Sequence, residues 1–504
     1  MARKHSITAK LLILFFIVAS ASVFAQSRSV TFPKLEPDSK AIEYYNLNYD
    51  HRNYSWQQLA EISLWASGSA ENTMPSNLDK IKSFIDAINN SPELPSGNKE
   101  KAGFILEFMH KNILRSYSLY QTRIDTLLSN GRFNCVSSAA LYIILCESAG
   151  IKVSGVMTKD HAFAIIHIDG GNIDVETTNI YGFDPGNRKE FHDTSGNITG
   201  FAYIPAQNYR DRQTISAIEL ISLIMNNRIV DLERTNRYAE AVPIAIDRAA
   251  LLYGNNLTIT NAADTSGNIF NDPRIDLRDR LFNYGATLLR ANREQDALSW
   301  AAAASPLYPD PDRWHEFIIA AVNNQINRLI RANRADEART FLEDQRKQLT
   351  EADYKHYDSL ILDGQVLGRT NRIRTFNEGE AVVNELSLIL ETGRLDERRA
   401  RELLTFAIQK TAQILSETPR GNWRAAMNYI QEAIVRFGVR RELEQSLEAY
   451  SANLATEYHN RFAAEWNRRN FSEAERILNE GLAEFPNDRQ LLRNKETVER
   501  QRGN

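Results

Sequence analysis

Cys135 and His161 are the side chains of this sequence best suited to covalent chemistry. The stretch SNGRFNC places Cys135 after a polar turn and before an apolar pattern of helical period, so its sulfur should lie at a helix N-terminus. The free backbone N–H groups and the positive dipole end of a helix stabilise a thiolate there. A thiolate beside a histidine base can attack a carbonyl carbon and form an acyl-thioester, so the pair predicts acyl-transfer chemistry.

Two acidic residues could orient the histidine. Three strands are predicted after the cysteine helix, at residues 152–158, 161–168 and 173–178, with a tight DGGN turn between the last two. Because side chains alternate along a strand, Asp174 and Glu176 share one face of the third strand. His161, at the start of the second strand, can then meet a carboxylate near the end of its antiparallel neighbour. Both acids remain candidates for this contact, and His167, on the same face as His161, is expected to be structural.

The two cysteines of the chain fall on one predicted helix, which runs over 136–149 and ends before Gly150. Cys135 and Cys146 would then lie about 16 Å apart along the axis, at about 1.5 Å per residue. A disulfide needs Cα atoms within about 7 Å of each other. We therefore predict that the two thiols are not bridged and that Cys146 is a buried packing residue.

From residue 98 to 186 the chain resembles the transglutaminase-like superfamily of papain-like cysteine enzymes. The matching stretches are GRFNC at the helix start, AGIKVSGV at the first strand, HAF at the second strand and VETT at the end of the third. The resemblance implies an α+β fold with a papain-like transglutaminase core, in which a helix packs on an antiparallel sheet. It also implies Cys135 as the nucleophile, His161 as the general base and Glu176 as the orienting acid, with Asp174 as its rival.

An oxyanion formed during attack on a carbonyl needs two hydrogen-bond donors, and the backbone N–H of Cys135 is one candidate. The resemblance would place a tryptophan before the cysteine region, but the sequence has none there. Tyr117, Tyr120 and Gln121 could donate instead. No acidic cluster is dense enough to indicate a calcium site, and we expect neither a metal nor a cofactor.

The flanking regions are predicted to be helical. A lead-in over 26–97 contains two helices, and a helix over 98–113 should back the sheet of the domain that covers 98–210. From 211 to 504 the composition changes, and the sequence predicts long helices with few glycines or prolines between them. In NFSEAERILNEGLAEFPND and REQDALSWAAAASPLYPD, small residues and a proline fall at the offsets of the second helix of a tetratricopeptide repeat. This all-α region therefore resembles a degenerate tetratricopeptide-like helical array, which commonly holds a peptide or protein.

The N-terminus has the pattern of a secretory signal peptide over 1–25. Basic residues precede a short apolar run over 11–19, and small residues at Val23 and Ala25 mark a cleavage site. The apolar run is shorter than the roughly 20 residues that span a bilayer, so we expect a periplasmic or secreted protein with no integral membrane span. With 60 basic and 64 acidic residues, the chain has no basic field for nucleic acid.

Two classes of function agree with these features. The first is an exported cysteine-dependent acyl-transfer enzyme, a protease, amidase or transamidase, that acts on a protein or peptide substrate and binds a protein partner through its helical repeats. The second is a non-catalytic cell-envelope interaction protein that uses the same fold as a binding module. The complete set of cysteine, histidine and acid favours the enzyme, whereas the missing tryptophan and the glutamate in place of the family's aspartate count against it.

Overall fold

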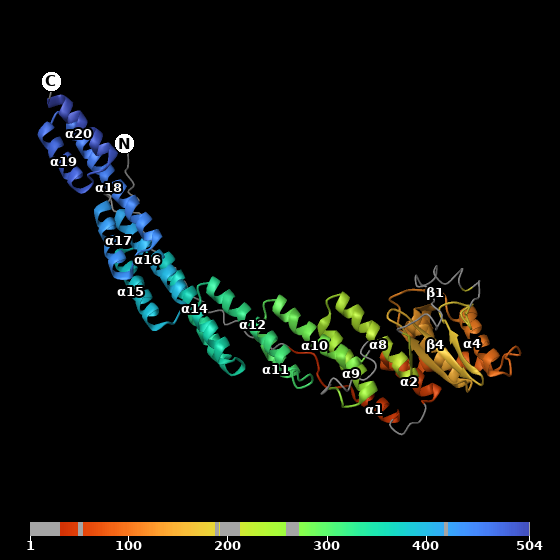
Figure 1. Ribbon diagram of the computed structural model, residues 1–504. Helices are drawn as coiled ribbons and strands as arrows, with labels where there is room; N and C mark the ends of the chain where they lie inside the picture. Colours follow the sequence, from red (N-terminus) through yellow and green to blue (C-terminus); the bar gives the residue numbers. More distant parts are fainter. Residues whose placement is uncertain are drawn as a thin grey trace, which may run out of the picture. The chain divides into compact units, whose positions relative to one another are not determined.

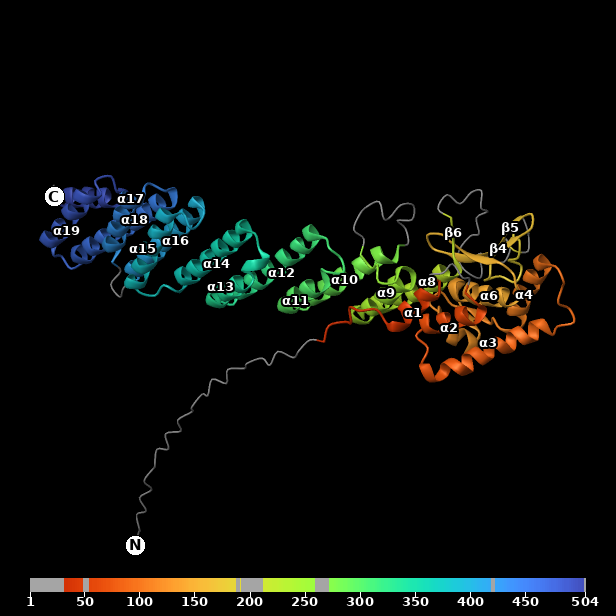
Figure 2. The same ribbon diagram turned by 90° about the horizontal axis from the view of Figure 1, so that it is seen from below.

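The computed structural model describes residues 31–48, 54–186, 191, 212–258, 272–417 and 422–502. The predicted signal peptide, 1–25, lies outside these residues. The described chain is mostly helical and carries a small antiparallel sheet, which confirms the predicted α+β class (Figures 1 and 2). It forms two compact units, and the first extends to Leu288 and takes in Ala302–Pro309. Within the described part, no helix is both long and apolar enough to cross a membrane.

Six helices build the N-terminal part of the first unit. They are α1 (Ser39–Asn48), α2 (Trp56–Ala66), α3 (Met74–Asn89), α4 (Asn98–Asn112), α5 (Ile124–Asn130) and α6 (Cys135–Ser148). The two predicted lead-in helices are confirmed as α2 and α3, and the helix predicted over 98–113 is α4. Ser55 caps α2 through a capping box with Gln58, which satisfies backbone N–H groups that a helix start leaves free.

The sheet has four strands in the order β5-β4-β3-β6, each antiparallel to its neighbours. The strands are β3 (Val153–Met157), β4 (Ala162–Ile168), β5 (Gly171–Val175) and β6 (Gln213–Ile215). The first three confirm the predicted strands with slightly shorter ends, whereas β6 has no counterpart in the sequence prediction. A separate parallel pair joins β1 (Ser116–Tyr117) to β2 (Arg132–Phe133), directly before α6.

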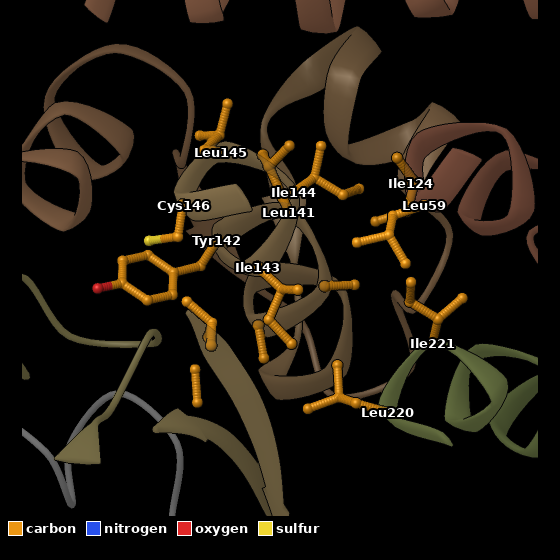
Figure 3. Close-up of a cluster of buried hydrophobic side chains, with 14 of the residues drawn as sticks. Leu59, Ile124, Leu141, Tyr142, Ile143, Ile144, Leu145, Cys146, Leu220 and Ile221 are labelled. Carbon is orange, nitrogen blue, oxygen red and sulfur yellow. The ribbon is translucent and has the colours of Figure 1, made fainter. Parts of the chain in front are cut away.

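Helix α6 forms the centre of the core. Every residue from Cys135 to Cys146 is buried, which is the burial expected of a helix that is apolar all round. One side of α6 packs on β3 and β4, as Figure 2 shows, and its other sides contact α2, α4 and α8. Figure 3 shows its side chains from Leu141 to Cys146 together with Leu59 of α2, Ile124 of α5, and Leu220 and Ile221 of α8. Both cysteines are free, as predicted, and Cys146 is fully buried.

The first unit continues into the region predicted as a helical array. Helices α8 (Ala217–Arg234) and α9 (Tyr238–Tyr253) pack on each other, and α8 also contacts α6 and β3. Leu220, Ile221 and Ile224 on α8 are fully buried in the same core as α6. The domain boundary predicted at 210 therefore falls inside the first unit, because the apolar face of α8 completes the core around α6.

The second unit is all-helical over its described residues. After α10 (Pro273–Arg290) come α11 (Glu294–Ala304), α12 (Pro311–Arg331), α13 (Ala335–Asp344), α14 (Glu351–Arg372), α15 (Phe376–Thr392), α16 (Glu397–Ser416), α17 (Trp423–Phe437), α18 (Arg441–Asn467), α19 (Phe471–Glu484) and α20 (Arg489–Arg502). Consecutive helices from α12 onward pack on each other. The small residues Ala474 and Gly481 of α19 are buried, and a Cβ at Gly481 would lie 3.1 Å from Leu491 and from Tyr458. Small side chains thus allow close helix packing here.

We predict that Gly155→Ala destabilises the first unit by about 1–3 kcal/mol, because the new methyl group overpacks the contact of β3 with α8. An added Cβ would lie 2.6 Å from Cδ1 of Leu220 and 2.9 Å from Cγ1 of Ile215. Urea denaturation measures the change. The exposed Lys152→Ala is the control and should change the free energy of unfolding by less than about 0.5 kcal/mol. Equal stability of the two variants would contradict the close approach.

Candidate functional site

Cys135 is the first residue of α6, as the sequence predicted. Its position is fixed by a capping box: the backbone N–H of Ser137 donates to Oδ1 of Asn134 at 3.0 Å, and the N–H of Asn134 donates to Oγ of Ser137 at 2.9 Å. The side-chain amide of Asn134 also donates to the backbone oxygen of Leu119 at 3.2 Å. The thiol therefore sits at the N-terminal, positive end of a capped, buried helix.

His161 lies directly before β4 and is held by a turn. Its backbone N–H donates to Oγ1 of Thr158 at 3.2 Å, and its carbonyl accepts from the N–H of Thr158 at 2.8 Å. Its ring Nε2 lies 2.6 Å from Oε2 of Glu176, which follows the end of β5. The predicted meeting of a histidine at one strand start with an acid at the neighbouring strand end is confirmed for Glu176.

The imidazole bridges the acid and the thiol. A carboxylate only accepts hydrogen bonds, so Nε2 carries the proton that is donated to Glu176. The side chain of Cys135 interacts with the same ring and raises its pKa. Nδ1 is the nitrogen that remains for the thiol, and it is buried away from solvent. Cysteine, histidine and glutamate thus form one connected chain in which the base is oriented from behind.

Burial and charge oppose each other at this pair. Burial lowers the pKa of His161, but the charge of Glu176 and the hydrogen bonds to Cys135 and Glu176 outweigh it and raise that pKa well above its ordinary value. Burial raises the pKa of Glu176, but the charge and hydrogen bond of His161, with those from Thr178, lower it overall. Both shifts favour an imidazolium beside a carboxylate.

Asp174, the rival acid, is not the partner of the histidine. Its two oxygens accept from the guanidinium of Arg212, with 2.6 Å between Oδ2 and Nη1. The same guanidinium lies over the ring of Phe163, 5.0 Å from the centroid. His167, on the same face, binds Asn172 through Nδ1 and Ser154 through Nε2, each at 2.8 Å, which agrees with the structural role predicted for it.

Glu176 is fixed by its own backbone neighbours. Its Oε1 accepts from the hydroxyl of Thr178 at 2.7 Å and from the N–H of the same residue at 3.2 Å. Its backbone N–H donates to the carbonyl of Gly182 at 2.8 Å. A Cβ at Gly182 would lie 1.9 Å from the backbone oxygen of Glu176, so only glycine allows this loop to return so closely. The carboxylate is therefore held at both oxygens.

His110, which the sequence analysis did not single out, braces the same loop from α4. Its Nε2 donates to the carbonyl of Thr177 at 3.1 Å, and the hydroxyl of Thr177 lies 2.8 Å from that of Ser138 on α6. Burial lowers the pKa of His110 to about 4, so the ring is neutral at neutral pH and donates through Nε2. No sequence motif marks this contact, because it joins residues on separate elements.

Of the three side chains considered as oxyanion donors, Tyr117 is the best placed. The amide of Gln121 already donates to the carbonyls of Arg123 and Arg132, at 2.7 and 3.0 Å. Tyr120 is 58 % exposed. The hydroxyl of Tyr117 is buried and has no hydrogen-bond partner among the described residues. Burial, and then the charges of Cys135 and Glu176, raise its pKa, so it stays protonated beside them.

The cysteine and histidine open onto a cavity of about 370 Å³. Its wall combines both residues with polar side chains from β6, α8 and α10, namely Gln213, Asn226, Asp276 and Arg280. This volume is within the range of about 300–1,000 Å³ typical of small-molecule sites. The described residues contain no cluster of three or more histidine, cysteine or acidic side chains that could hold a metal ion.

A comparison of the chain with models of known protein families finds no match, and a comparison with curated proteins finds none either.

We predict that Glu176→Gln lowers the pKa of His161, because glutamine keeps the size of the side chain and removes the charge that raises that pKa. NMR titration of the His161 ring measures it. Asp174→Asn is the matched control, since Asp174 binds Arg212 instead, and it should leave the pKa of His161 nearly unchanged. Equal effects of the two substitutions would contradict the assignment of Glu176.

The same substitution should lower the free energy of unfolding by about 1–3 kcal/mol in a defined pH window. A raised pKa of His161 stabilises the fold below the unfolded value near 6.5 and loses this effect as pH rises through the folded value. A lowered pKa of Glu176 stabilises the fold above 4.5 and loses this effect as pH falls. Urea denaturation should therefore show the largest difference in unfolding free energy between wild type and Glu176→Gln at pH values between 4.5 and 6.5.

Proposed function

We propose that the chain is an exported cysteine-dependent acyl-transfer enzyme with a papain-like, transglutaminase-like core. One observation carries the proposal: Cys135 begins a capped helix and lines the same cavity as His161, whose Nε2 binds the buried Glu176. A nucleophile, a base and an orienting acid in this order are what thiol-based acyl transfer requires. The motifs GRFNC, HAF and VETT that suggested the resemblance carry these three residues.

The residues would act as follows. His161 takes the thiol proton of Cys135, and the sulfur bonds to the carbonyl carbon of an amide. The C–N bond then breaks, and the imidazolium returns the proton to the leaving amine. Water or a second amine attacks the acyl-thioester, gives a proton to His161 and frees the thiolate. Glu176 holds the ring in its tautomer and stabilises the imidazolium.

Two donors are proposed for the oxyanion. The backbone N–H of Cys135 belongs to the first turn of α6, where N–H groups have no partner within the helix. The hydroxyl of Tyr117 is the second, because β1 pairs with β2 and so brings Tyr117 opposite Phe133, two positions before Cys135. A tyrosine would thereby replace the tryptophan that the resemblance implies.

The helices after α10 are proposed to form a degenerate tetratricopeptide-like array that binds a protein partner. The buried small residues at the predicted repeat positions support this, since Ala297, Ala301 and Ala474 are all at most 2 % exposed. The pattern over 1–25 supports a periplasmic or secreted location, where a peptide or protein substrate would be met.

The second candidate function is a non-catalytic interaction protein. The limited exposure of Cys135, 8 %, favours it, because a nucleophile must reach its substrate. The cavity beside the thiol argues for access, and acylation of the thiol separates the two functions.

We predict that p-nitrophenyl acetate acetylates Cys135, with a thioester detected by mass spectrometry of the intact and digested full chain. His161→Ala should slow this acetylation by about 10²-fold, the usual size of general-base catalysis. Cys146→Ala is the control and should leave the rate unchanged, since that thiol is fully buried. Acetylation that is absent, or that is indifferent to His161, would favour the interaction protein.

Tyr117→Phe should lower kcat for the same ester by about 10–100-fold and change KM little, because only the hydroxyl that stabilises the transition state is lost. Tyr120→Phe is the matched control, since this exposed hydroxyl lies outside the site. Steady-state kinetics measures both. A Tyr117→Phe enzyme with full kcat would remove Tyr117 from the mechanism.

A further inference from the structure

The cavity that holds the thiol is also lined by an arginine whose own ion pair is weak. Arg280 on α10 is 15 % exposed and lines the cavity. Its Nε lies 3.4 Å from Oε2 of Glu233, which is an ion pair too long for a strong hydrogen bond. The other oxygen of Glu233 accepts from Asn283 at 3.1 Å. Across the described chain, Arg280 makes no hydrogen bond, and its Nε is buried.

Of the two acids that line the cavity, Asp160 is exposed, and Asp276 is already neutralised. Asp276, one helical turn before Arg280, accepts a hydrogen bond from Arg248, whose side chain is 1 % exposed. Arg248 also reaches the amide oxygen of Asn226 at 3.4 Å. Lys159 is the other cation of the cavity lining, and it is exposed to solvent next to Asp160. Arg280 is the one that presents a planar guanidinium, which binds carboxylates best.

Gln213, which also lines the cavity, has a side-chain oxygen that accepts no hydrogen bond within the described chain. This oxygen, Oε1, is buried, and Gln213 itself lies on β6. A buried acceptor left without a donor costs about 1–3 kcal/mol, so its satisfaction by an N–H group of a ligand is favoured. The cavity lining thus holds a donor for a carboxylate, and the amide of Gln213 could accept from an N–H group once its side chain turns toward the ligand.

We propose that the cavity binds the carboxyl-terminal end of a peptide, with its free carboxylate on Arg280 and a backbone N–H on Gln213. The carboxyl-terminal end of a peptide carries a carboxylate, which complements Arg280, and a backbone N–H, which complements Gln213. The thiol lines the same cavity. The inference rests on the proposed function and adds its substrate class: the enzyme would act near the free carboxyl terminus of a peptide.

The reaction would then remove the end of the chain. The sulfur of Cys135 bonds to the carbonyl carbon of one of the last peptide bonds, and the C–N bond of that peptide group breaks. The leaving amine receives the proton from His161 and departs with the carboxylate that Arg280 held. Water hydrolyses the thioester, so one peptide bond and one water become a shortened peptide and a free amino acid or short peptide.

Binding is tested with the full chain carrying Cys135→Ala, which cannot form a thioester. Two matched libraries of N-acetylated tripeptides are used, one with free carboxylates and one with carboxamides, and retained peptides are counted by mass spectrometry. The protein should retain the carboxylates at least about tenfold more strongly, and adding Arg280→Gln should remove this preference. Arg278→Gln on the same helix is the matched control, since Arg278 binds Asp279 and does not line the cavity.

The outcomes separate the inference from the proposed function. Equal retention of both libraries, no retention, or the same loss in Arg278→Gln as in Arg280→Gln would overturn the carboxylate site. Carboxylate retention that depends on Arg280, without cleavage by the wild-type chain, would keep the site and overturn the enzyme. Cleavage of both libraries alike by the wild-type chain would keep the enzyme and overturn the site. Thermal unfolding confirms that each variant is folded.

Discussion

The hydrogen bond between His161 and Glu176 is the interaction on which the candidate site depends. Glu176 is 2 % exposed, and a carboxylate this deeply buried is destabilising unless it is paired and hydrogen-bonded. Both of its oxygens are occupied, one by His161 and the other by Thr178. The loop that carries it is in turn fixed to α4 and α6 through Thr177. The acid therefore links the histidine to the helix that presents the cysteine.

This arrangement explains why the first unit extends beyond the sheet. Helix α6 is buried on all sides, so its face away from the sheet needs apolar partners, and α8 supplies them with Leu220 and Ile221. The same helix continues to Asn226, which lines the cavity together with Arg280 of α10. Elements whose sequence is typical of a repeat region thus complete the core and also line the cavity that holds the thiol.

Local patterns were sufficient to predict the elements that carry the site. The start of α6 at Cys135, the antiparallel strands and the shared face of Asp174 and Glu176 follow from apolar spacing, turn residues and strand alternation. The same alternation could not choose between the two acids, because they share a face. Arg212, the residue directly before β6, binds Asp174 through a contact that is distant in sequence. Glu176 is the acid that binds His161.

The sequence by itself determined which reactive side chains are present and where they lie on their elements: a thiol at a helix start, a histidine at a strand start and an acid at a strand end. Only the tertiary structure decided which acid binds the histidine, that His110 and Tyr117 lie beside them, and that Arg280 faces the same cavity. The reason is physical. Local spacing fixes which side chains share a face, whereas burial, charge pairing and cavity walls arise only when separate elements pack together.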